Sequence, residues 1–256
     1  MKYYTADSIR NVGIFGHAGE GKTTLAEAML FNAGLLDRIG KVENGTTASD
    51  FDPEEIKRSC SINMSVLPIE WKDTKINFID APGGYDFYGD VASTMFLCDS
   101  AIIVVGAVSG PVVGAEKAMA MCHEQHKPHI MVINQMDREN ANFEKVMADV
   151  NEKFGPSVVP IQLPIMQGSN FVGFVDIVNS VAYKFGPKGL EEIAVPGNLE
   201  SEVQELYEKR GCCRNRRGSY GEVLRRDGAP QGRYSVWFEQ GREGRFRYSR
   251  CVRVCS

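Results

Sequence analysis

The amino-acid sequence predicts an α/β fold built on a doubly wound, mostly parallel sheet. Three observations lead to this prediction. Short apolar runs, typical of buried strands, alternate with segments of helical period over the first 155 residues. A glycine-rich turn joins the first of these runs to the first helical segment. Right-handed crossovers between parallel strands then place helices on both faces of the sheet.

The strands and helices alternate along the chain with one exception. Strands are expected at residues 12–15, 62–71, 75–80, 101–108 and 129–134, and helices at residues 23–33, 88–98, 114–126 and 143–154. The exception is the pair 62–71 and 75–80, which only three residues separate. This spacing suits a hairpin, so we expect one antiparallel strand at an edge of the sheet.

After residue 155 the alternation gives way to a different pattern. Short strands separated by Gly, Pro and Asn are expected at residues 158–163, 171–177 and 181–185, followed by a polar helix at residues 199–209. We therefore divide the chain into a core domain of residues 1–155, a small inserted subdomain of residues 156–209 and a tail of residues 210–256.

The tail differs sharply in charge from the rest of the chain. Residues 1–209 carry 4 Arg, 13 Lys and 29 acidic residues, whereas residues 210–256 carry 12 Arg, no Lys and 4 acidic residues. One interpretation is a basic arm that binds RNA, because aromatic residues lie among the arginines. The other is a shifted reading frame, since codons for this segment read one nucleotide later can encode an amphipathic helix. The tail cysteines lack the two-residue spacing of a zinc knuckle.

The sequence indicates a cytoplasmic protein with no membrane partner. The first residues hold no apolar stretch behind a basic head, as a signal peptide would. The longest apolar run, residues 101–113, is interrupted by glycines and Pro111 and is shorter than the roughly 18 to 20 residues of a membrane span. We expect a monomer that does not bind DNA.

The strongest chemical signal is a phosphate-binding loop between the first strand and the first helix. It reads Gly16-His17-Ala18-Gly19-Glu20-Gly21-Lys22-Thr23, a G-x-x-x-x-G-K-T pattern. Glycines let backbone N–H groups turn toward phosphates, and the helix start adds a positive dipole. Lys22 is expected to reach the outer phosphates, and the Thr23 hydroxyl to bind Mg²⁺.

A second motif identifies the base. Asn134-Gln135-Met136-Asp137 follows the strand 129–134, at the edge where open α/β sheets bind ligands, and approximates N-K-x-D. A carboxylate at Asp137 accepts from the ring N–H and the exocyclic amine of guanine, which adenine does not offer. Gln135 stands where this motif has lysine. A helix-capping pair is the alternative interpretation of these polar residues.

Two further segments are candidate nucleotide switches. Asp80-Ala81-Pro82-Gly83 comes directly after a strand, and Arg58-Ser59-Cys60-Ser61-Ile62 comes before the hairpin. Asp80 is expected to hold Mg²⁺ through water, the Gly83 N–H to contact the γ-phosphate, and the Ser61 hydroxyl to bind the metal. An ordinary β-turn and a polar strand start are the alternatives.

In this order, the motifs of residues 8–209 resemble the GTP-binding domain of elongation factor G and its relatives, including the ribosomal protection proteins. Thr24 matches the second threonine that follows the family's phosphate loop. The resemblance implies a P-loop NTPase G domain that binds GTP or GDP with Mg²⁺ and has the ribosome as partner. It also implies that Lys22, Ser61 and Gly83 serve GTP hydrolysis, and that the chain is a truncated translocation factor.

One residue departs from the family pattern at a position that matters for hydrolysis. Gly84 stands where the family has the histidine that positions the attacking water, while Asp86 and Phe87 keep the register. We therefore expect GTP binding with slow hydrolysis. The alternatives are a non-hydrolysing GTP-dependent switch and a ribosomal protection-type factor. An ATP-using phosphotransferase is disfavoured by Asn134 and Asp137.

Overall fold

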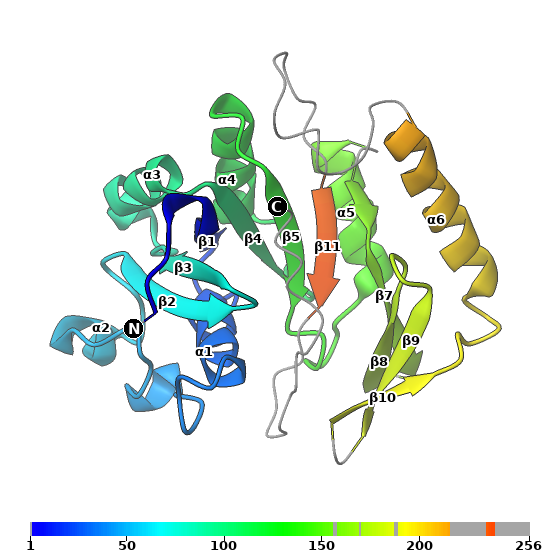
Figure 1. Ribbon diagram of the computed structural model, residues 1–256, viewed down its shortest axis with the longest axis horizontal. Helices are drawn as coiled ribbons and strands as arrows, with labels where there is room; N and C mark the ends of the chain where they lie inside the picture. Colours follow the sequence, from blue (N-terminus) through cyan, green and yellow to red (C-terminus); the bar gives the residue numbers. More distant parts are fainter. Residues whose placement is uncertain (1, 156–157, 169, 187–188, 216–233, 239–256) are drawn as a thin grey trace.

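The computed structural model describes residues 2–155, 158–168, 170–186, 189–215 and 234–238. These residues form a seven-stranded and a four-stranded sheet, together with the helices that cover them. In Figure 1, the strands β1 to β5 occupy the left and centre of the view, and the strands β7 to β10 lie toward the right.

The larger sheet is mostly parallel. Its order is β2 (Ser65–Trp71), β3 (Thr74–Asp80), β1 (Ile9–Gly16), β4 (Ser100–Gly106), β5 (His129–Asn134), β11 (Tyr234–Phe238) and β6 (Val158–Pro160). Each neighbouring pair is parallel except β2 and β3, which are antiparallel. Lys72 and Asp73 between them have φ of 44° and 64°, as in a tight type I′ hairpin turn. The mostly parallel sheet with one antiparallel strand is thus confirmed.

Helices cover both faces of this sheet, as expected for a doubly wound fold. On one face, α1 (Lys22–Asn32) buries Leu25 and Leu30 against alternate strand residues such as Ile14. On the other face, Phe15 packs in a second cluster with buried residues of α3 (Tyr88–Leu97), α4 (Val113–Glu124) and α5 (Phe143–Phe154). Successive strand residues point to opposite faces, so β1 supplies both cores.

The smaller sheet is antiparallel and lies in the expected subdomain. Its order is β10 (Gly189–Ile193), β9 (Val181–Gly186), β8 (Asn170–Asp176) and β7 (Gln162–Gln167). Val203 of α6 (Glu200–Asn215) packs in its core cluster. The single strand expected at residues 158–163 is split, because β6 joins the larger sheet and β7 the smaller. The division into domains at residue 155 remains a prediction.

Two described segments belong to the expected tail. The helix α6 continues to Asn215, and β11 pairs in parallel with both β5 and β6. The sequence pattern predicted neither feature. The rest of the tail, residues 216–233 and 239–256, lies outside the described residues, so both interpretations of it remain predictions.

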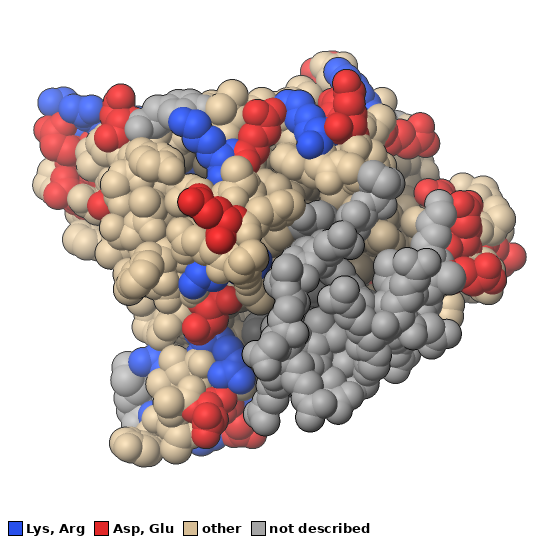
Figure 2. Space-filling view, turned by 90° about the horizontal axis from the view of Figure 1, so that it is seen from above, with Lys and Arg blue, Asp and Glu red and all other residues tan. Residues whose placement is uncertain are grey.

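Several short elements were not predicted either. They are the strand β10, the helix α2 (Pro53–Arg58) and the 3₁₀ turns η1 (Ala6–Ser8), η2 (Val42–Asn44) and η3 (Tyr85–Phe87). Within the described part of the chain, no helix has the length and apolarity that a membrane span requires. Figure 2 shows acidic side chains gathered at the right-hand end of one face, over α6, and mixed charges elsewhere on that face.

Candidate functional site

The phosphate loop lies between the end of β1 and the start of α1. Gly19 and Gly21 adopt left-handed φ values of 83° and 84°, which favour glycine. A side chain at Gly21 would also collide with the side-chain amide of Asn134. Gly21 is the N-cap of α1, so a bound anion at this position can accept hydrogen bonds from the unpaired N–H groups of the first helical turn. Thr24, in the first turn of α1, is exposed.

Lys22 is buried within this loop. Its Nζ donates to the His17 carbonyl oxygen at 2.8 Å, and the residue is only 6% exposed. Burial lowers the pKa of Lys22, while the carboxylates of Asp80, Glu20 and Asp50 oppose the shift. The ammonium group is therefore largely desolvated, and three nearby carboxylates favour its charged form.

The turn after β3 lies directly against the loop. A Cβ at Gly83 would collide with Lys22 Nζ and would lie 2.7 Å from the backbone nitrogen of Ala18. Only glycine permits this approach. The structure thus brings Gly83 together with Lys22, and the contact of the Gly83 N–H with the γ-phosphate stays a prediction.

The three predicted metal ligands meet beside Lys22. Thr23 Oγ1 donates to Asp80 Oδ2 at 2.7 Å and lies 3.2 Å from Ser61 Oγ. Ser61 Oγ in turn donates to Asp50 Oδ1 at 2.8 Å. The cluster therefore consists of two hydroxyls and two carboxylates, contributed by α1, β3 and the loops on both sides of α2.

Asp50 is a member of this cluster that the sequence analysis missed. It is 4% exposed, and it comes from a loop with no motif of its own, so only the tertiary structure reveals it. Burial raises its pKa, and burial also raises the pKa of Asp80 to about 6 although Lys22 and Thr23 oppose that shift. Asp50 Oδ2 and Asp80 Oδ1 have no hydrogen-bond partner among the described residues. Buried, all-oxygen donors with unused carboxylate atoms fit Mg²⁺.

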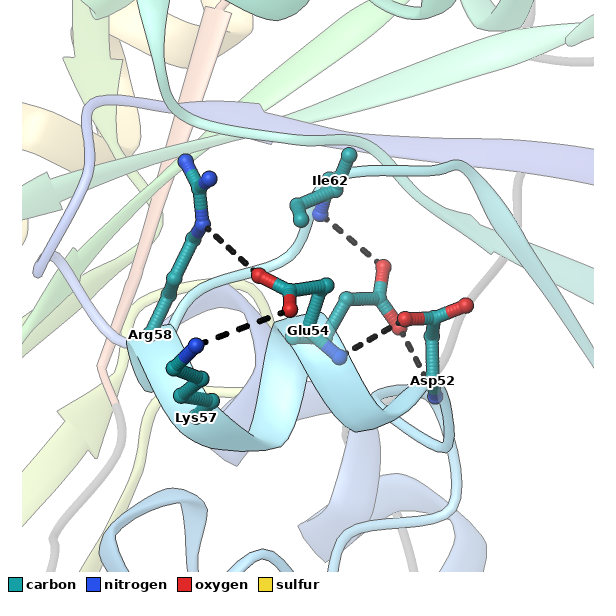
Figure 3. A network of polar contacts seen from close by, with 6 residues as sticks. Asp52, Glu54, Lys57, Arg58 and Ile62 are labelled. Carbon is teal, nitrogen blue, oxygen red and sulfur yellow. Dashed lines mark hydrogen bonds and ion pairs between the residues drawn. The ribbon is translucent and has the colours of Figure 1, made fainter.

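A capping box holds the segment that carries Ser61. Asp52 caps α2 by accepting from the Glu54 N–H at 2.8 Å, and Glu55 reaches back to the Asp52 N–H (Figure 3). Glu55 is 2% exposed, and its Oε1 also accepts from the N–H groups of Ile62 and Asn63 at 2.9 and 3.0 Å. One carboxylate therefore fixes both the start of α2 and the residues after Ser61.

The predicted base-reading segment touches the phosphate loop. Asn134 is 6% exposed, and its Nδ2 donates to the Glu20 carbonyl at 2.9 Å. Gln135, with φ of 64°, donates through Nε2 to the Gly19 carbonyl at 2.9 Å. Gln135 therefore bridges to the loop in place of the lysine of the motif. Asp137 follows in the turn after β5 and is half-buried.

Gly84 borders a pocket beside the phosphate loop. A Cβ built there would lie 3.2 Å from the Phe87 ring, so a side chain needs only a small shift of that ring. The pocket is small, with a cavity volume of about 30 Å³, and it opens to solvent. Its lining residues are Phe15, Gly16, Pro82, Gly83, Gly84, Tyr88, Val91, Gly114, Lys117 and Ala118. Among the described residues, a methyl group at position 84 would meet only the Phe87 ring.

Comparisons with known proteins agree with this geometry. Residues 7–223 match the family model of the elongation factor Tu GTP-binding domain. The chain is 35% identical over 201 residues to an elongation factor G-like protein of Thermotoga maritima, and 34% identical over 207 residues to elongation factor G of Chlamydia caviae. These matches cover 78% and 79% of this chain, but only 29% and 30% of the relatives.

A solved structure supports the same assignment. A crystal structure of a protein from Thermus thermophilus superposes with a TM-score of 0.80 at 28% identity, covering 91% of this chain and 37% of that one. The sheet order, the phosphate loop and the family match point to one conclusion. The chain belongs to the family of the elongation factor Tu GTP-binding domain, and it carries the P-loop G domain of a translational GTPase.

Proposed function

We propose that this chain binds GTP and GDP together with Mg²⁺, as the nucleotide-binding part of a factor like elongation factor G. The observation that carries the proposal is the meeting of Thr23, Ser61 and Asp80 beside the buried Lys22. Lys22 would contact the outer phosphates, the Thr23 and Ser61 hydroxyls would bind the metal, and Asp80 would hold it through water. Mg²⁺, when bound by these residues, would offset the negative charge of the outer phosphates.

Guanine selectivity is assigned to Asp137. Its carboxylate would accept from both N–H donors of guanine, and adenine would leave these contacts unmatched. Competition of GTP and ATP for a labelled guanine nucleotide tests this role. We expect GTP to compete at far lower concentration, and equal competition by ATP would reject the assignment.

Hydrolysis is proposed to be slow. Lys22, Thr23 and Ser61 would supply charge stabilisation, but Gly84 has no side chain with which to orient the attacking water. Such a group commonly contributes about 10²- to 10⁴-fold to a rate. Single-turnover hydrolysis should therefore be faster in a Gly84→His variant than in the parent, with and without ribosomes. Equal rates would mean that another residue orients the water.

A second candidate function, a GTP-dependent switch that does not hydrolyse GTP, is favoured by the same glycine. In that case the parent would bind GTP without turnover, and nucleotide exchange would reset it. Measuring GTP hydrolysis in the presence of ribosomes separates the two candidates, because any hydrolysis that ribosomes stimulate would exclude the non-hydrolysing switch.

The ribosome is proposed as the partner, and the cytoplasm as the location. The support comes from the names of the relatives, whose length this chain spans to less than a third. The chain as given would then be a truncated G domain of a longer factor. Cosedimentation with ribosomes in GTP, GDP and nucleotide-free buffers tests the partnership, and GTP-dependent pelleting is the expected result.

A further inference from the structure

Glu20 is a buried carboxylate inside the phosphate loop that the proposed chemistry does not use. It is 6% exposed, and Ser109 Oγ donates to its Oε1 at 2.8 Å. A Cβ at Gly106 would collide with its Oε2, so the side chain lies against the end of β4. The backbone carbonyl of Glu20 accepts from Asn134, but the carboxylate itself has a different neighbour.

Glu20 forms no ion pair within the described part of the chain, and the cation that its charge influences is the nearby Lys22. The ion pairs found there involve Asp73, Glu54 and Glu116 instead. Asp50 and Asp80 differ from Glu20, because their charges face the hydroxyl cluster where a divalent cation would offset them. Glu20 contacts a neutral hydroxyl and shares the loop with the proposed phosphate site.

A buried charge acts strongly on its neighbours, since the protein interior screens it less than water does. Glu20 lies two residues before Lys22, and its carboxylate raises the pKa of Lys22 against the lowering by burial. The same field opposes the negative phosphates that Lys22 would bind. The repulsion increases with the number of phosphate charges, whereas a contact with the base or the ribose is unaffected.

We propose that the Glu20 carboxylate weakens the binding of guanosine di- and triphosphates and speeds their release from this loop. The inference rests on the proposed function, because it concerns the same nucleotide site. The Glu20 side chain would then increase the rate at which bound nucleotide exchanges with nucleotide in solution.

The test is a Glu20→Gln variant, which keeps the shape of the side chain and an oxygen that can accept from Ser109. Dissociation rates and affinities should be measured for fluorescent GDP and, by competition, for GTP, GMP and guanosine. We expect Glu20→Gln to bind GDP and GTP about tenfold more tightly, the change that about 1.4 kcal/mol produces, mostly through slower release. The gain should be smaller for GMP and absent for guanosine.

Two further variants control for charge and folding. Glu124→Gln removes the same charge from an exposed position at the far end of α4 and should leave every affinity unchanged. Glu20→Ala removes the carboxylate without introducing an amide, and it should tighten GDP binding in the same direction.

The outcomes separate this inference from the function on which it rests. Unchanged GDP affinity in both Glu20 variants overturns the inference, and so does an equal gain for guanosine, which would indicate shape rather than charge. If the parent and both folded variants bind no guanine nucleotide, the proposed function itself fails.

Discussion

Replacing Glu55 with alanine should release the Ser61 segment from the rest of the site. Glu55 Oε1 accepts from the N–H groups of Ile62 and Asn63 at 2.9 and 3.0 Å, and Oε2 accepts more weakly from Asp52 at 3.3 Å. A hydrogen bond to a charged group contributes about 1.5 to 3 kcal/mol. The two shorter bonds together therefore contribute about 3 kcal/mol or more to the folded segment.

Two measurements report the loss of these hydrogen bonds. Urea unfolding reports the free energy of unfolding of the whole domain, and hydrogen exchange reports the Ile62 and Asn63 amides separately. If the segment detaches locally, the global stability falls by less than about 3 kcal/mol while both amides lose protection. Whether the segment detaches locally or the whole domain is destabilised, Mg²⁺-dependent GTP affinity should fall, because Ser61 is no longer held beside Thr23.

Matched variants sharpen the result. Glu54→Ala removes an exposed acid whose ion pairs with Lys57 and Arg58 span 3.8 and 3.5 Å, and such pairs contribute less than about 1 kcal/mol. Glu55→Gln keeps one acceptor oxygen for Ile62 and Asn63, so it should be milder than Glu55→Ala. The reasoning is refuted if the two amides stay protected in Glu55→Ala, or if Glu54→Ala is equally destabilising.

Three other outcomes are expected. Asp137→Asn should weaken GTP binding by about tenfold or more while leaving ATP binding unchanged, as a nucleotide titration of both forms will show. Gly83→Ala should impair GTP binding because its methyl group meets Lys22 Nζ, whereas Gly84→Ala, which meets only the Phe87 ring, should bind as the parent does. Burial lowers the pKa of His129 to about 4 from 6.5, so the unfolded chain takes up a proton first as the pH falls. The contribution of His129 to the free energy of unfolding should therefore drop by up to about 3 kcal/mol between pH 6.5 and 4, against an opposite contribution from Asp80, whose pKa burial raises to about 6. A His129→Gln variant should lose this drop relative to the parent in urea unfolding.

Most elements of the larger sheet could be predicted from sequence, because strands such as β1, β4 and β5 contain short apolar runs. Residues 129–134 form β5 with the expected bounds, and residues 143–154 form α5 likewise. The helix α2 was missed because six residues are too few to show a helical period. Its capping pair, Asp52 and Glu55, is a signal in the sequence that indicates the start of a helix.

The site was predictable where a motif carries it and not where only tertiary structure does. Lys22 and Thr23 belong to one continuous pattern whose geometry follows from the backbone. Asp50 reaches the site because the loop before α2 folds back to Ser61, and no spacing in the sequence indicates that approach. The strand β11 was missed for a related reason, since its arginine-rich surroundings show no alternation and its place depends on β5 and β6.

The hairpin of β2 and β3 has a mechanical consequence. Ser65, at the start of β2, pairs with Asp80, at the end of β3, so the open end of the hairpin lies at the cluster that Asp80 forms with Thr23 and Ser61. Seven paired positions link the strands, and β3 is anchored to β1 along one side. The segments before β2 and after β3 are therefore connected by a paired, two-stranded hairpin, so they do not behave as independent loops. A displacement of one by a ligand would be transmitted to the other within the same motion.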